Sequence, residues 1–87
     1  MTNHEYAMKL ISLYTALYEI EQHKYDNIWK SFHECLDDND IEFSVVKYEY
    51  DGNHQKGRYV IIFNDDFFVI TVESKHHGYI KWSIENE

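Results

Sequence analysis

Carboxylates gather in one short run of this sequence, CLDDNDIEF, which spans residues 35–43. A calcium loop that began at Asp38 would place Glu49 at the twelfth position, where such loops carry a bidentate glutamate. Its sixth position is Phe43, however, where the loop needs glycine, and the following residues alternate like a strand. We therefore expect no metal here. The run is either a solvated helix end or an acidic surface for a basic partner, and its members are Asp37, Asp38, Asp40 and Glu42.

A second acidic pattern resembles the Asp…Glu-x-Lys motif of restriction-type nucleases, with Asp66, Glu73 and Lys75 in the three positions. In that motif the acidic residues converge on a metal ion that activates water. Here the two acids lie at opposite ends of one predicted strand, so at ~3.3 Å per residue they are ~23 Å apart. One metal ion cannot be bound by both, and we expect no nuclease activity.

No other residue set suggests catalysis or a cofactor. The six histidines are scattered or adjacent in turns, whereas a zinc site needs three or four convergent ligands. Cys35, the single cysteine, lies on a predicted apolar helix stripe, where it acts in packing. The three glycines are isolated and form no phosphate-binding loop. The sequence therefore predicts a protein that is not an enzyme and binds no cofactor or metal.

Two amphipathic helices are predicted in the first half of the chain. Thr2 and Glu5 have the spacing of a capping box, and apolar residues then recur every three or four positions, which predicts a helix over residues 3–22. One helix through both apolar stripes would be ~51 Å long, so we expect a break at Lys24–Asp26, with Asp26 as the N-cap of the second helix. The second stripe consists of Ile28, Trp29, Phe32, Cys35 and Leu36.

The second half of the chain alternates with a period of two, as strands do. A strand is predicted over 41–50, a loop over 51–57, and two strands joined by a turn at Asp65 and Asp66, followed by a last strand in YIKWSI. The predicted fold is α+β: one domain over 1–87, with a helical half (3–38) packed on one face of a four-stranded antiparallel meander (41–85). The predicted core-face pairs are Phe63–Phe68, Ile61–Ile70, Tyr59–Val72, Val72–Ile80, Ile70–Trp82 and Phe68–Ile84.

The opposite face of this sheet is predicted to be apolar and aromatic, although a sheet covered on one side should be polar on the other. Large exposed apolar patches usually mark interaction sites. Either the second helix or a terminus covers this face, or a homodimer or another partner does. The residues assigned to it are Val46, Tyr48, Tyr50, Val60, Ile62, Phe67 and Val69.

Charge narrows the class of partner. The formal net charge is −8, most of it in the first half of the chain, so direct binding to phosphate backbones is disfavoured. An acidic protein more readily meets a basic protein surface. No signal segment is visible, and the apolar runs are far shorter than the ~20 residues that span a membrane, so we expect a cytoplasmic protein.

The preferred interpretation is a small non-enzymatic binding protein that inhibits or neutralises a larger partner with a basic or nucleic-acid-binding surface. Phage or mobile-element inhibitors of host defence enzymes, anti-CRISPR proteins and DNA mimics among them, have this composition. Asp37, Asp38, Asp40 and Glu42 would steer and pair with the partner, and Tyr48 and Tyr50 would be its apolar anchors. Two alternatives are a homodimeric structural or adaptor protein and a toxin-neutralising immunity protein or antitoxin.

Overall fold

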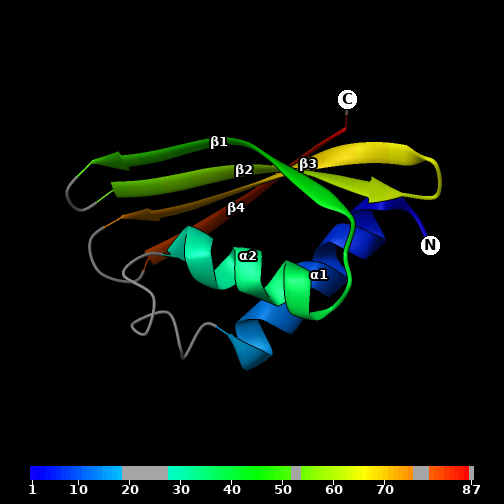
Figure 1. Ribbon diagram of the computed structural model, residues 1–87, viewed down its shortest axis with the longest axis horizontal. Helices are drawn as coiled ribbons and strands as arrows, with labels where there is room; N and C mark the ends of the chain where they lie inside the picture. Colours follow the sequence, from blue (N-terminus) through cyan, green and yellow to red (C-terminus); the bar gives the residue numbers. More distant parts are fainter. Residues whose placement is uncertain (19–27, 52–53, 76–78, 87) are drawn as a thin grey trace.

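The computed structural model describes residues 1–18, 28–51, 54–75 and 79–86, and it contains two helices followed by four strands (Figure 1). The strands form one antiparallel sheet in the order β1-β2-β3-β4, so the predicted α+β class and the predicted meander are confirmed. Figure 1 draws both helices on the same side of the sheet. The elements are α1 (Asn3–Leu17), α2 (Ile28–Asp38), β1 (Phe43–Asp51), β2 (His54–Phe63), β3 (Asp66–Lys75) and β4 (Tyr79–Asn86).

The predicted capping box begins α1. The Glu5 backbone N–H donates to the Thr2 hydroxyl at 3.1 Å, and the Thr2 N–H donates to the Glu5 carboxylate at 3.0 Å. The helix ends at Leu17, with Tyr18 as its C-cap, so the predicted end at residue 22 is wrong. Its fully buried stripe stops at Tyr14 and Leu17 is exposed, although Tyr18 still packs against the core. The predicted break and Asp26 cap lie outside the described residues.

The second helix buries the stripe that the sequence indicated. Ile28, Phe32, Cys35 and Leu36 are each at most 2% exposed. The first N–H groups of a helix have no partner within the helix. In α2, the Ile28 N–H donates to the side-chain oxygen of Gln55, on β2, at 2.6 Å. This hydrogen bond joins the start of the helix to the sheet.

The turn between β2 and β3 lies one residue earlier than predicted. Asn64 and Asp65 have φ values of 52° and 63°, as a type I′ turn requires, and asparagine tolerates this conformation well. The predicted β2–β3 and β3–β4 pairs are therefore wrong by two residues. Because a shift of two keeps every side chain on its face, the predicted core-face residues still share one side. The observed pairs are Ile61–Phe68, Tyr59–Ile70, Gly57–Val72, Val72–Trp82 and Ile70–Ile84.

A β-bulge in β1 changes which face its aromatic residues occupy. Val45 pairs with Tyr59 and Lys47 with Arg58, so Val46 is an extra residue. Beyond it, Tyr48 pairs with Gly57 and Tyr50 with Gln55, which places both tyrosines on the face that carries the core. Their predicted position on the opposite face is wrong.

The residues predicted as a loop over 51–57 also differ from the structure, because β2 already begins at His54. Gly57 is buried within β2 and pairs with Tyr48 on one side and Val72 on the other. Pairing on both sides of β2 therefore holds this glycine in a strand, although glycine by itself weakens strands.

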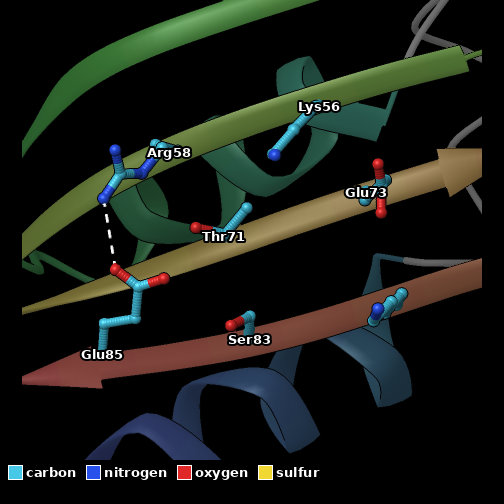
Figure 2. Close-up of a pocket in the computed structure, with 7 residues that line it drawn as sticks. Lys56, Arg58, Thr71, Glu73, Ser83 and Glu85 are labelled. Carbon is cyan, nitrogen blue, oxygen red and sulfur yellow. Dashed lines mark hydrogen bonds and ion pairs between the residues drawn. The ribbon is translucent and has the colours of Figure 1, made fainter.

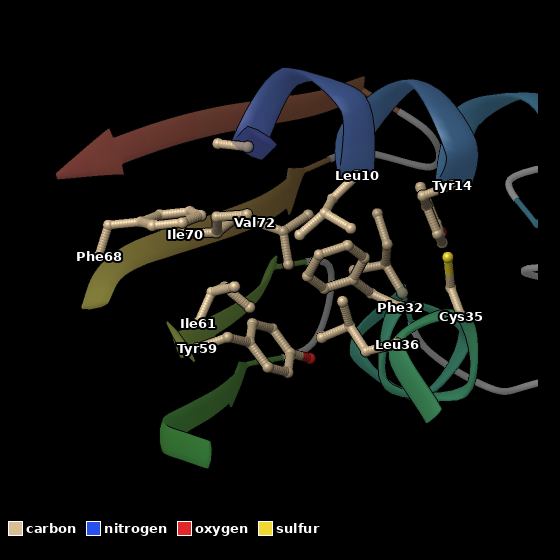
Figure 3. Packing of buried hydrophobic residues seen from close by; sticks show 12 residues of the cluster. Leu10, Tyr14, Phe32, Cys35, Leu36, Tyr59, Ile61, Phe68, Ile70 and Val72 are labelled. Carbon is tan, nitrogen blue, oxygen red and sulfur yellow. The ribbon is translucent and has the colours of Figure 1, made fainter. Parts of the chain in front are cut away.

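The core lies between the helices and the sheet (Figure 3). Phe32 is at its centre, and its ring is T-shaped against the rings of Tyr59 at 4.9 Å and Trp82 at 5.1 Å. The Tyr14 and Ser31 hydroxyls, both buried, are hydrogen-bonded at 2.7 Å, which links α1 to α2. Burial raises the pKa of Tyr59, and the nearby Tyr14 adds to the shift. Within the described residues, no helix has the length and apolar character to cross a bilayer.

Candidate functional site

The acidic run lies at the C-terminal end of α2 and in the connection to β1. The Ile41 N–H donates to the Leu36 carbonyl at 3.0 Å and the Asp40 N–H to the Asp37 carbonyl at 3.2 Å, which is the pattern of a Schellman motif. Asp40, with φ of 55°, has the left-handed conformation that glycine usually supplies in this motif. The chain therefore turns sharply at Asp40. The four carboxylates that the sequence singled out are all exposed: Asp37, Asp38, Asp40 and Glu42.

These carboxylates are in a place that does not favour them energetically. The C-terminus of a helix carries partial negative charge, and α2 has no basic residue in its last turn. Two contacts compensate in part. The His33 ring nitrogen Nε2 lies 3.1 Å from Asp37, and the Tyr18 hydroxyl donates to Asp38 at 3.1 Å.

The ion pairs that the structure describes for lysine and arginine do not reach this run. Among the described residues, the ion pairs that involve these cations join Lys47 to Glu49 at 2.8 Å and Arg58 to Glu85 at 3.3 Å. Both pairs lie on the sheet face that points away from the core. The acidic run therefore keeps its negative charge toward solvent.

The two predicted anchors, Tyr48 and Tyr50, lie apart from the acidic run. At ~3.3 Å per residue along β1, Tyr50 is about 25 Å from Glu42. The structure does not bring them into one cluster. Like the acidic run, however, they lie on an exposed part of the molecule, because β1 is an edge strand that is exposed along most of its length. Tyr50 and Val46 are more than half exposed.

We call the sheet face opposite the core the outer face. The prediction that this whole face is apolar is wrong, because only one end of it is apolar. The registers place Val60 opposite Val69 and Ile62 opposite Phe67, near the β2–β3 turn. The rest of the face is polar and charged, and the charges that the registers place on it nearly balance: Lys47, Lys56, Arg58, Lys75 and Lys81 against Glu49, Asp51, Glu73 and Glu85. The formal charge of −8 thus resides elsewhere in the chain.

A hollow of about 390 Å³ lies on the outer face (Figure 2). Thr71 and Ser83 pair with each other across β3 and β4, and their short side chains leave a depression among longer ones. The sequence does not indicate this hollow, because it depends on two short side chains that are in register on neighbouring strands. The residues that line it are Lys56, Arg58, Thr71, Glu73, Lys81, Ser83 and Glu85.

A histidine and a glutamate are paired on the outer face. His54 Nε2 lies 2.5 Å from the Glu73 carboxylate, but the described hydrogen bonds do not connect this pair to the hydroxyl of Thr71 or Ser83. Within the described ranges, no three His, Cys, Asp or Glu side chains gather as metal ligands. Burial, with the nearby Asp38 carboxylate as a second cause, raises the pKa of Cys35 to about 11, which disfavours the reactive thiolate.

Comparison with known proteins gives no relative: no family model matches the chain, and neither the curated proteins nor the solved structures contain a significant match.

Proposed function

We propose that this protein is a non-enzymatic inhibitor that binds a larger protein through the acidic run and the exposed edge of β1. The observation that carries the proposal is the exposure of four carboxylates at a helix C-terminus without a lysine or arginine partner among the described residues. Acidic residues at this end of a helix are unfavourable for the isolated fold. A basic partner surface would turn that cost into a favourable interaction.

The edge strand extends this surface. A partner that contacts both Glu42 and Tyr50 has to lie along β1, over about 25 Å, which is within the span of a standard protein interface. In this arrangement the carboxylates steer the approach and pair with the partner. Tyr50, with Tyr48 beside it, supplies the apolar contact at the far end, as tyrosines often do in interfaces. The partner's own backbone can add to the unpaired edge of β1.

The negative charge favours a partner whose basic surface normally binds nucleic acid, and a DNA-mimicking inhibitor of a phage or mobile element acts in this way. An immunity protein or antitoxin would present the same surface to a basic toxin. Competition separates these versions: a DNA mimic is displaced from its partner by duplex DNA, whereas an inhibitor that binds elsewhere on the partner is not.

The test is a capture experiment in extract of the native host, followed by kinetics on the captured partner. Asp38→Asn combined with Asp40→Asn should slow association and flatten its dependence on salt, because the steering charges are gone. Asp65→Asn combined with Asp66→Asn, at the β2–β3 turn, removes equal charge from another exposed place and serves as the matched control. Equal association rates for the two double variants at every salt concentration would contradict the assignment.

A further inference from the structure

The outer face carries a row of four charges that alternate in sign across the four strands. In the observed registers, Glu49 on β1 is opposite Lys56 on β2, Lys56 is opposite Glu73 on β3, and Glu73 is opposite Lys81 on β4. Read from β1 to β4 the row is negative, positive, negative, positive. Read in the other direction it has the opposite sign at every position, so the row is complementary to itself.

We propose that a second copy of this chain covers the outer face, related to the first by a two-fold axis that runs parallel to the strands between β2 and β3. Such an axis places β1 over the partner's β4 and β2 over the partner's β3. Glu49 then meets the partner's Lys81, and Lys56 meets the partner's Glu73. Each contact occurs twice, as in every two-fold interface. This inference is independent of the proposed function, which uses the acidic run and the edge of β1.

The row next to this one fits the same axis. It contains Lys47, Arg58, Thr71 and Ser83 in register across the four strands. The axis places Arg58 over the partner's Thr71 and Lys47 over the partner's Ser83. The two long side chains therefore face the partner's hollow of about 390 Å³, while Arg58 stays paired with Glu85 and Lys47 with Glu49 of its own chain. Cations there meet hydroxyl oxygens, and no like charges oppose each other.

The apolar end of the face fits as well. Val60 lies over the partner's Val69, which is already buried in its own chain at 1% exposure, and Ile62 lies over the partner's Phe67, which is 40% exposed. The apolar contact between copies therefore comes mainly from Ile62 and Phe67. A two-fold axis perpendicular to the strands gives a worse match. Centred on the Arg58 row, it would place Lys56 over the partner's Val60, and centred on the Lys56 row, it would place Lys56 over the partner's Lys56.

The charges of the face are suited to such a contact. Among the residues that the structure describes, no ion pair includes Lys56 or Lys81, although each is directly opposite Glu73 in the sheet. The near balance of charge on this face lets two copies approach, whereas the helix side, with its acidic run, repels a copy of itself. The two acidic runs of the dimer remain exposed.

The size of the face predicts an interface of modest affinity. Four strands ~4.8 Å apart and about eight residues long present roughly 500 Å² per copy before side-chain relief is counted. This is toward the low end of the ~800 Å² per partner that specific interfaces usually bury. We therefore expect dimerisation that depends on concentration and weakens with salt.

The experiment measures molar mass by sedimentation equilibrium, from ~10 to ~500 µM, a range that covers interfaces of this size. The wild-type protein should dimerise. Lys56→Glu alone and Glu73→Lys alone should each weaken the dimer by about 100-fold or more, because like charges then face each other twice. Lys9→Glu, on α1, makes the same change of charge away from the face and should leave the dimer unchanged.

Mixing separates an interface from a folding defect. In an equimolar mixture of the Lys56→Glu and Glu73→Lys variants, every like-charge contact between copies becomes an opposite-charge contact, so heterodimers should form. Only a contact between copies produces this rescue, since mixing changes nothing within a chain. A wild-type monomer across the whole range, or a mixture that stays monomeric when both variants show native circular dichroism, would overturn the proposal.

Discussion

Asp40 offers a sharp test of the idea that the acidic run is kept at the expense of stability. Its φ of 55° belongs to the left-handed region, where glycine is the favoured residue after a helix. Its carboxylate also lies just beyond the negative end of α2. Two substitutions separate these effects: Asp40→Asn removes the charge and keeps a side chain that tolerates the conformation, and Asp40→Gly removes both the charge and the steric strain.

The magnitudes follow from these two effects. Removing the charge should stabilise the fold by about 0.3–1 kcal/mol. Removing the Cβ relieves about 1–2 kcal/mol of left-handed strain, of which the greater freedom of glycine in the unfolded chain offsets about 0.5–1 kcal/mol. Asp40→Gly should therefore stabilise by about 1.5 kcal/mol in total. For a domain of this size that raises Tm by roughly 6–12 °C.

Urea denaturation followed by circular dichroism measures these differences, provided that the transition is two-state. With a slope of about 1.5 kcal/mol/M, the midpoint for Asp40→Gly should rise by about 1 M. Asp40→Ala should be less stable than Asp40→Asn, because alanine lacks the local hydrogen bonding that makes this conformation tolerable. The advantage of Asp40→Asn should shrink in ~1 M salt, where charges are screened. A glycine variant no more stable than the wild type would refute this reasoning.

Two further predictions concern the buried thiol and the first helix cap. Because the pKa of Cys35 is about 11, alkylation at pH 8 should be at least about 100-fold slower than for a model thiol of pKa 9.0. Addition of ~6 M urea should restore the normal rate of alkylation. Fast labelling of the native protein would contradict the burial of α2. Thr2→Ala should destabilise the protein by about 1 kcal/mol, measured by denaturation, with Ser12→Ala on the exposed face of α1 as the control. The hydrogen bonds to the Thr2 backbone and side chain lower the pKa of Glu5. Its stabilising effect is thus complete above the unfolded pKa and is lost as pH falls through the lowered folded value. A Thr2→Ala variant that is as stable as the wild type would contradict the cap.

The sequence predicted the local features of this fold well, because they depend on near neighbours. The capping box at Thr2 and Glu5 and the buried stripe of α2 both follow from spacing alone. The order of the strands followed from short connections between apolar runs. The end of α1 at Leu17 could not be read in this way, because Leu17 continues the apolar period but lies beyond the surface that the sheet covers.

The errors in the sheet came from features that leave no trace in a period of two. A bulge next to two consecutive valines is invisible in the pattern, since Val45 and Val46 fit either face. Yet this single residue moves Tyr48 and Tyr50 to the core side. The turn was misplaced because Asn64 and Asp66 are both acceptable turn residues, and only the backbone conformation shows which is used. The acidic run, by contrast, was visible at once, and its exposure agrees with the simplest expectation for aspartate.

The hydrogen bond between the Ile28 N–H and Gln55 has a consequence for the order of events in folding. A helix cap usually comes from a residue beside the helix, so that the first turn forms before any distant contact. Here the acceptor for this N–H is on β2, and its pairing with Tyr50 requires the β1–β2 hairpin. Hydrogen exchange at the Ile28 amide therefore reports separation of the helical layer from the sheet. The first turn of α2 is thus coupled to β2 through this bond.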